Sequence, residues 1–285
     1  MAALTRTLRQ KFKVGHSTVA RLLRQRGYAL RSNRKRLSRR QDPQRDEQFR
    51  YIARQRRKFD KANLPRISVD TKKKELIGLF KNPGRTWRQA PREVLATDFP
   101  NDAAGKAIPY GIYDPNQNAG YVSVGTSHET PAFAVAAIRS WWLEVGRHVY
   151  RGKDALLIEA DGGGANGYRC WLWKYGLQQL ADEFQLTITV THYPTGASKW
   201  NPVEHRLFCY ISGNWAGRPL DSFETVVKFI RTTTTSTGLR CRARLDTTDY
   251  PTGLKVTAEQ KNFVNLERHR TLPKYNYTIH PHPCQ

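Results

Sequence analysis

The chain has 285 residues, 39% of them hydrophobic, and its 48 Lys and Arg against 24 Asp and Glu give a formal net charge of +24. This length allows one large domain with an appendage or two domains, and the charge indicates a polyanionic partner. The sequence has no secretory signal, no run long enough to span a membrane, and no cysteine spacing typical of a zinc knuckle or a disulfide framework. We therefore expect a cytoplasmic protein without a membrane partner.

Positive charge is concentrated at the beginning of the chain. The first 66 residues contain 21 Lys and Arg against 4 acidic residues, whereas the rest of the chain contains 27 against 20. A solubilising tail is the simplest explanation for such a segment. Because this one also has helical periodicity, we favour an arm that contacts nucleic acid.

Two short helices are predicted within this arm. Residues 4–12 and 17–24 carry apolar side chains at helical spacing, with a break at 14–16 between them and Gly27 after the second. The order helix, tight turn, helix is typical of a helix-turn-helix unit, although any short helical hairpin has the same pattern.

The second of these helices has two distinct faces. We expect Val19, Leu22 and Leu23 to face inward and Arg21 and Arg24 to face outward. The two arginines are therefore predicted DNA contacts.

A nearly continuous basic linker follows at 31–40. It is either a solvated joint or a phosphate-binding segment, and the two are compatible. The predicted DNA contacts here are Arg34, Lys35 and Arg36.

A third helix is predicted after the linker. Asp42 would cap it and Pro43 would occupy its first position. Its apolar side chains, Phe49, Ile52 and Phe59, share one side, and many arginines lie on the other.

From Leu64 onward the pattern becomes that of an α/β domain. Three strands precede alternating helices and strands, which is the element order of a ribonuclease-H-like mixed sheet flanked by helices. The predicted strands are 66–80, 107–113, 120–125, 155–160, 186–191 and 239–245. The predicted helices are 130–145, 167–183, 221–231 and 257–268, together with a helix that bears Glu204. Asn166 is the predicted cap of the helix 167–183. Residues 81–105 are a predicted loop. The resulting domains are 1–30, a partial helix-turn-helix segment; 31–62, the basic linker and helix; and 63–285, the catalytic domain with a C-terminal extension.

Three carboxylates occupy positions where they could converge. Asp70 and Asp161 each end an apolar, strand-like run, and Glu204 opens a helix after the last strand of the series. Asp161 alone could belong to a turn and Asp70 alone could face water. Glu204 could complete a capping box with Asn201 as the cap, which is the better explanation on local grounds alone. The ends of neighbouring parallel strands are, however, where α/β sheets present ligand groups.

Converging carboxylates would repel one another unless cations neutralised them. We therefore predict that Asp70, Asp161 and Glu204 are both catalytic and metal-binding residues. Mg²⁺, or Mn²⁺ in its place, suits an all-oxygen site, and two ions could serve the attacking and the leaving oxygen.

Other polar residues are weaker candidates. Glu159 would share a face with Asp161 and is a second choice as a ligand, while the remaining acids of the region, Glu93, Asp98, Asp102 and Asp114, lie in loops. His192 and His205 are more simply explained as structural residues.

Basic and aromatic residues near the carboxylates could hold DNA. Lys72 and Lys73 directly follow Asp70 and are either a solvated strand face or DNA contacts. Lys199 could meet a phosphate and Trp200 could stack on an unpaired base, although Trp200 could equally be a packing residue.

At these residues the chain resembles a known family, the ISAzo-type insertion-sequence transposases with a Rhodopirellula-type DDE domain. The matching strings are VDTKKKELIGLFKNPGR (69–85), PYGIYD (109–114), ADGGGANG (160–167), SKWNPVEHRLF (198–208), TTTTSTGL (232–239) and Tyr-Asn-Tyr-Thr-Ile near the end. The resemblance runs from about residue 4 almost to the C-terminus. It implies a ribonuclease-H-like fold, divalent metal, and a DDE triad that falls on Asp70, Asp161 and Glu204.

We therefore expect a DNA transposase associated with the nucleoid. It would hydrolyse a phosphodiester at the end of an insertion sequence and join the freed 3′-hydroxyl to target DNA, and cleavage of paired ends would favour a homodimer. Family members usually begin with a longer N-terminal region. This difference keeps open a DNA-binding remnant or regulator without catalysis, and a structure-selective nuclease on the same fold is the other alternative.

Overall fold

The computed structural model describes residues 2–29, 31 and 43–283, without the side chains of 2–4 and 198. The chain forms two compact units, 1–39 and 40–285. Four residues of the sequence predictions, Arg34, Lys35, Arg36 and Asp42, lie outside the described residues.

The first unit contains the two predicted helices, α1 (Ala2–Arg9) and α2 (His16–Gln25). Arg21 and Arg24 face solvent as expected, and Val19 is buried. Leu22 is 45% exposed, so the prediction that it faces inward is wrong. The hairpin is too small to cover all the apolar side chains of α2.

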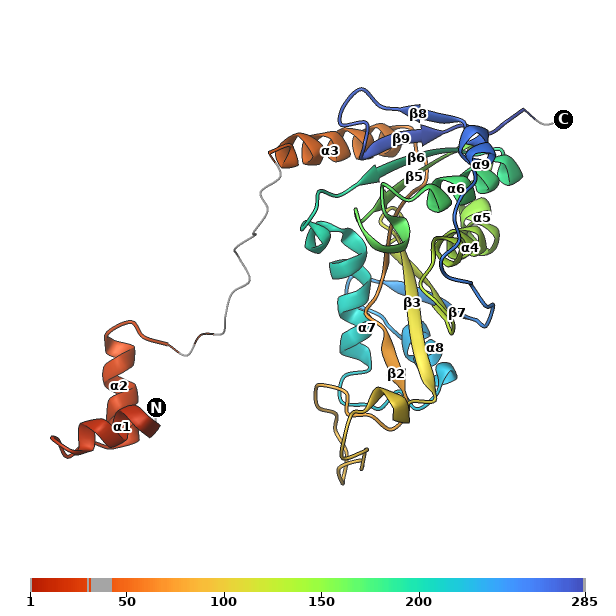
Figure 1. The fold of residues 1–285 in the computed structure, drawn as a ribbon. Coiled ribbons are helices and arrows are strands. Elements are labelled where there is room, and N and C mark those ends of the chain that lie inside the picture. Colours follow the sequence, from red (N-terminus) through yellow and green to blue (C-terminus); the bar gives the residue numbers. More distant parts are fainter. Residues whose placement is uncertain (1, 30, 32–42, 284–285) are drawn as a thin grey trace. The chain divides into compact units, whose positions relative to one another are not determined.

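The second unit is built on one mixed sheet. Within residues 43–283 its strands are β1 (Arg66–Thr71), β2 (Glu75–Ile77), β3 (Gly105–Asp114), β4 (Ala119–Gly125), β5 (Ala155–Ala160), β6 (Thr187–His192), β7 (Arg240–Asp246), β8 (Leu266–Arg268) and β9 (Asn276–Ile279). Their order is β7-β4-β3-β1-β5-β6-β9-β8, with β2 paired to β3 (Figure 1). The central strands β4-β3-β1-β5-β6 combine an antiparallel hairpin with two parallel crossovers. This topology confirms the predicted ribonuclease-H-like fold.

Helices cover both faces of the sheet. They are α3 (Arg45–Lys61), α4 (Pro131–Trp141), α5 (Arg147–Val149), α6 (Trp171–Phe184), α7 (Cys209–Asn214), α8 (Phe223–Arg231) and α9 (Ala258–Phe263). Among the shorter turns are η3 (Gly164–Asn166), η4 (Ser198–Trp200) and the π-helical turn η5 (Glu204–Phe208), which runs directly into α7.

The sheet separates two apolar cores, because successive side chains of a strand point to opposite faces. Ile67 and Val69 join a core with α4 and α6 on one face. On the other face a second core is formed with η5, α7 and α8, and a small apolar cluster lies beneath α3. Ser68 and Asp70 alternate with Ile67 and Val69, and Ser68 bonds to residues just before η5.

Several predicted boundaries are wrong. The span 66–80 holds two strands, β1 and β2, and the span 257–268 holds helix α9 followed by strand β8. The helix after the linker begins at Arg45, because Pro43 and Gln44 form a turn. Asn166 does not cap α6, because α6 begins only at Trp171. The side chain of Asn166 is instead buried and accepts a hydrogen bond from Tyr110.

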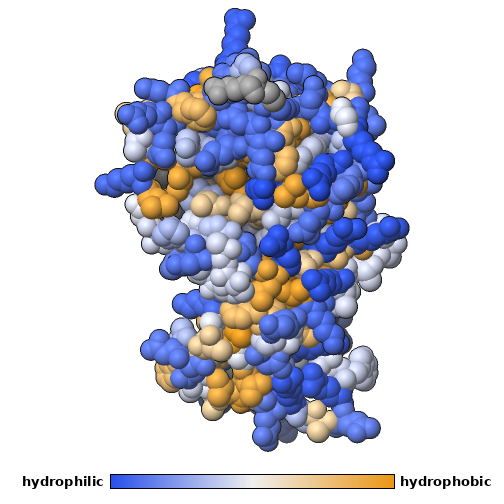
Figure 2. All heavy atoms as spheres, turned by 90° about the vertical axis from the view of Figure 1, so that its right-hand side faces the viewer, coloured by the Kyte–Doolittle hydropathy of each residue, from blue (hydrophilic) through white to orange (hydrophobic). Residues whose placement is uncertain are grey.

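The face of the molecule drawn in Figure 2 is predominantly polar. Figure 2 shows hydrophilic side chains over most of one face, interrupted by smaller apolar patches. No helix in the described part of the chain is both long enough and apolar enough to cross a membrane.

Candidate active site

The parallel pairing of β1 with β5 brings two predicted site residues to the same edge of the sheet. Val69 is paired with Ala160, so Asp161, which follows the last residue of β5, lies beside Asp70, which is still within β1. Both side chains are partly exposed. The prediction that the two strands are neighbours is confirmed, although β1 continues one residue beyond Asp70, to Thr71.

Asp70 lies at the centre of the acidic cluster. Burial, the larger cause, and the negative charges of Asp161 and Glu204 together raise the pKa of its carboxyl to about 8. The N–H of Thr71 donates to Asp70 Oδ1 at 2.8 Å and opposes this shift. Because Asp70 interacts with both other acids, the three predicted residues form one electrostatic cluster.

Glu204 begins the π-helical turn η5. Burial, and to a smaller extent the charge of Asp161, raise the pKa of its carboxyl. A hydrogen bond with Asp70 and the charge of Lys72 oppose this shift. Burial also raises the pKa of Asp161, against a hydrogen bond from the N–H of Gly162. Short π-helical insertions occur often at functional sites.

The helix that carries Glu204 is capped from the sheet. The Ser68 hydroxyl of β1 accepts a hydrogen bond from the N–H of Val203 at 2.9 Å. The Asn201 side chain is bonded to Ser68 and to the carbonyl of Val69 instead of to its own helix. Asn201 directly precedes the helical residues, as predicted, and its carbonyl accepts from the N–H of Glu204 at 3.1 Å. Its side chain does not cap the helix, however, so the predicted capping box with Glu204 is wrong.

Two glycines let this helix approach the sheet. A Cβ atom on Gly111, the residue paired with Asp70, would lie 2.2 Å from Cε1 of Phe208. A Cβ atom on Gly120 of β4 would lie 2.4 Å from Cδ1 of Leu207. The backbone of β3 and β4 is therefore in direct contact with the side chains that follow Glu204.

The loop after Asp161 is fixed by buried hydrogen bonds. Tyr110 donates to the side chain of Asn166 at 2.9 Å, and Nε2 of His192 lies 2.8 Å from the carbonyl oxygen of Asn166. His192 is fully buried, and burial lowers its pKa to about 4. These contacts agree with the expectation that His192 is a structural residue.

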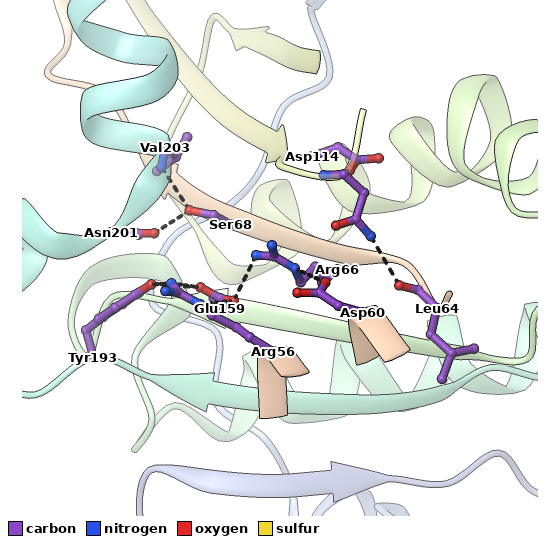
Figure 3. Close-up of polar contacts among 11 residues, drawn as sticks. Arg56, Asp60, Leu64, Arg66, Ser68, Asp114, Glu159, Tyr193, Asn201 and Val203 are labelled. Carbon is purple, nitrogen blue, oxygen red and sulfur yellow. Dashed lines mark hydrogen bonds and ion pairs between the residues drawn. The ribbon is translucent and has the colours of Figure 1, made fainter. Parts of the chain in front are cut away.

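Glu159, the second-choice ligand, has other partners. Its side chain is 1% exposed and binds the Arg56 guanidinium of α3 and the hydroxyl of Tyr193, the latter at 2.7 Å (Figure 3). This carboxylate therefore anchors α3 to β5.

A divalent cation is compatible with the donor set of the acidic cluster. Three carboxylates supply oxygen ligands only. The raised pKa of Asp70 reflects burial and, beside it, the negative charges of Asp161 and Glu204, which a cation would neutralise. Among the residues that the structure describes, no group of three His, Cys, Asp or Glu side chains is already arranged to hold a metal ion. Mg²⁺ commonly binds one or two carboxylates and completes its shell with water and phosphate oxygens. Asp70, Asp161 and Glu204 therefore fit a metal site whose remaining ligands are water and phosphate oxygens of the substrate.

A cavity of about 800 Å³ adjoins Glu204. Lys73, Lys74 and Lys81 are exposed along it. Lys72, in contrast, is 8% exposed, binds Glu75, and lies 4.6 Å from the centre of the Trp215 ring. Lys73 is thus better placed than Lys72 to meet a phosphate.

The remaining predicted contacts are separate from this cavity. Lys199 and Trp200 are exposed in η4, with Nζ of Lys199 5.3 Å from the centre of the Trp200 ring. The Trp200 ring also contacts Phe49 of α3, with the ring centres 6.1 Å apart. Arg21 and Arg24 belong to the first unit and are described only within it.

Sequence reasoning missed the residues that support the cluster. Ser68 was the available signal, because it is a polar residue within an apolar strand and lies two positions before Asp70. The partners of Ser68, Gly111 and Arg56 are far away in sequence, so no local pattern could identify them.

The sequence and the fold were compared with known proteins. A family model described as the Rhodopirellula transposase DDE domain matches residues 1–281. Among curated proteins, none matches significantly. A structure of the Mos1 transposase paired-end complex with left transposon end is 17% identical at a TM-score of 0.48, and the match covers 78% of this chain and 64% of that one. Mos1 paired-end complexes with Mn and with Mg are 16% and 15% identical at a TM-score of 0.46 with the same coverage, so this chain spans just under two thirds of the Mos1 chain.

Proposed function

Since the chain belongs to the Rhodopirellula transposase DDE domain family, we propose that it is a DNA transposase acting at insertion-sequence ends. We assign Asp70, Asp161 and Glu204 as its catalytic and metal-binding residues. The observation that carries this assignment is the parallel pairing of β1 with β5 through Val69 and Ala160, which sets Asp70 beside Asp161. The charges of Asp161 and Glu204 both raise the pKa of Asp70, which supports the grouping of all three.

The proposed reaction has two steps in one site. Water attacks the phosphorus at the end of the element, which breaks the phosphodiester and frees a 3′-hydroxyl. That hydroxyl then attacks a phosphodiester of the target, and the bond from phosphorus to the target's 3′-oxygen breaks. Each step exchanges one phosphorus–oxygen bond for another, so no oxidant or energy-rich cofactor is needed.

Asp70, Asp161 and Glu204 would hold the divalent cation, Mg²⁺ or Mn²⁺, and we propose two ions. Bound there, cations activate the attacking oxygen and stabilise the charge on the leaving oxygen. Asp70 must give up its proton when a cation binds, because burial and the neighbouring charges favour its neutral form. Gly162 and Thr71 orient two of the carboxylates through their N–H groups.

DNA would reach this site along basic side chains. We propose that Lys73, Lys199 and Trp200 contact the strand near the carboxylates, and that Arg21 and Arg24 contact duplex DNA from the first unit. The support is their exposure and charge, together with the aromatic ring of Trp200 as a stacking surface. Because two element ends must be processed together, we also propose a homodimer, which light scattering with and without end DNA would test.

Cleavage of end-containing DNA tests the function. Purified protein with Mg²⁺ should nick the element end and join it to a second duplex, and Asp161→Asn should lose at least about 100-fold in rate, as expected for a group that stabilises transition-state charge. Glu93→Gln, at an exposed loop acid, is the matched control and should cleave normally.

Three outcomes would contradict parts of this proposal. Full activity of Asp161→Asn would remove that residue from the site. Specific end binding without metal-dependent nicking would indicate a catalytically silent DNA-binding remnant or regulator. Hydrolysis without joining would indicate a structure-selective nuclease.

A further inference from the structure

A buried polar bridge connects strand β1 to the helix that carries Glu204. The Ser68 hydroxyl donates to Oδ1 of Asn201 and accepts from the N–H of Val203 at 2.9 Å (Figure 3). Nδ2 of Asn201 donates to the carbonyl oxygen of Val69 at 3.0 Å. Two side chains thus provide three hydrogen bonds between the same two segments.

This bridge is sealed from water. Ser68 is 1% exposed, and Asn201 and Val203 are not exposed at all. Without competing water each bond is stronger, and loss of one partner leaves a buried polar group unsatisfied. The relative position of the two segments is therefore tightly determined.

The bridged residues lie directly before two of the proposed catalytic carboxylates. Ser68 and Val69 precede Asp70 in β1, and Asn201 and Val203 precede Glu204. Few rotatable bonds separate the bridge from either carboxylate, so a shift of the bridge moves one carboxylate relative to the other. The neighbouring contact of Phe208 with Gly111 limits how far the helix can adjust.

An ordinary helix cap would not need this arrangement. A capping Asn uses its side-chain oxygen on the N–H groups of its own helix. Asn201 instead uses its side chain entirely on β1, and Ser68 of β1 supplies the cap. The helix start is therefore defined by the strand that carries Asp70.

We infer that Ser68 and Asn201 are positioning residues that set the spacing between the Asp70 and Glu204 carboxylates. This inference rests on the proposed function of those two carboxylates. Misplacement of catalytic groups by about 1 Å can lower a rate about 100-fold without loss of substrate binding. A residue that only stabilised the fold would lower the melting temperature and leave the rate of the folded protein unchanged.

The experiment compares Asn201→Ala and Ser68→Ala with Thr189→Val in the full chain. Thr189 also makes a buried hydrogen bond, to Thr278 at 3.1 Å, but this bond joins β6 to β9, and β5 lies between β6 and the bridged strand β1. End cleavage is measured well below each melting temperature, with KM, kcat and the affinity for uncleaved end DNA. We expect kcat to fall about 100-fold in both positioning variants, with KM and DNA affinity unchanged and Thr189→Val at the wild-type kcat.

A second readout does not depend on activity. The rise in melting temperature that Mn²⁺ causes is measured for Asn201→Ala, Glu204→Gln and the double variant. If Asn201 acts through Glu204, each single variant reduces the Mn²⁺ effect and the double variant reduces it no further.

The outcomes separate the two proposals. Wild-type kcat in Asn201→Ala and Ser68→Ala, or an additive loss of the Mn²⁺ effect, would overturn the positioning role. Lack of cleavage by the wild type would instead overturn the proposed function, and the Mn²⁺ cycle would still decide whether Asn201 acts through Glu204.

Discussion

At the scale of single residues, buried charge pairs decide how firmly the site is supported. Glu159 is 1% exposed, and the Arg56 side chain that binds it is 31% exposed. Arg56→Met should lower the free energy of unfolding by about 3–5 kcal/mol, because it leaves a buried carboxylate without its main partner. Every tryptophan lies between residues 87 and 215, so fluorescence during urea unfolding follows the second unit.

A double variant provides the control for this prediction. Arg56→Met combined with Glu159→Gln should recover part of the lost stability, since the neutral amide no longer requires a cation. Equal losses in the single and the double variant would show that the charge pair is not what stabilises the contact of α3 with β5.

At the scale of elements, the sequence predicted what depends on local periodicity. The apolar run of β5, the hairpin of β3 and β4, and the helices over the sheet were all recognisable, and so was the position of Asp70 and Asp161 near strand ends. Strand β9 was missed because Asn276–Ile279 is short and gains its burial from pairing with β6 and β8. The start of α6 was misplaced because Asn166, a good local cap, binds Tyr110 instead.

The approach of the Glu204 helix to the sheet depends on Gly111. Gly111→Ala should lower the free energy of unfolding by about 1–3 kcal/mol, because the new methyl group overlaps the Phe208 ring. Gly213→Ala, in α7 with no atom near the added methyl group, is the matched control and should be neutral or stabilising by up to about 1 kcal/mol. Urea unfolding of both variants checks this, and an unchanged Gly111→Ala protein would contradict the close packing of helix and sheet.

Helix α3 presents its outer face as a row of cations. Its buried face holds Gln48, Ile52 and Phe59, and exposed basic residues lie opposite at positions 50, 54, 57 and 61. If this face contacts duplex DNA, the logarithm of the binding constant should depend less steeply on the logarithm of salt concentration once the row is neutralised. The slope should fall by about 0.9 for each DNA phosphate that the variant no longer neutralises.

The measurement uses a fourfold Gln variant of the α3 row. The matched control removes the same charge from exposed positions elsewhere, namely Arg147, Arg151, Lys255 and Lys261. An equal change of slope in both variants would mean that net charge alone, not the α3 face, determines binding.

At the scale of the whole molecule, cation binding and protonation compete for one acidic cluster in a strongly basic protein. Without metal, the raised pKa of Asp70, about 8, means that the folded state holds a proton that the unfolded chain releases. The contribution of Asp70 to stability is therefore largest below pH 4 and is lost as the pH rises through 8.

A divalent cation should reverse this dependence. Because the cation needs the ionised carboxylate, Mn²⁺ affinity should rise by up to tenfold for each pH unit between about 6.5 and 8 and level off above that. Titration calorimetry in buffers of different ionisation enthalpy should show close to one proton released per cluster at pH 7 and almost none at pH 9. Asp70→Asn should bind Mn²⁺ weakly and without this slope, whereas Glu93→Gln should behave as the wild type. A wild-type affinity that is flat across this range would mean that Asp70 is not among the groups that hold the cation.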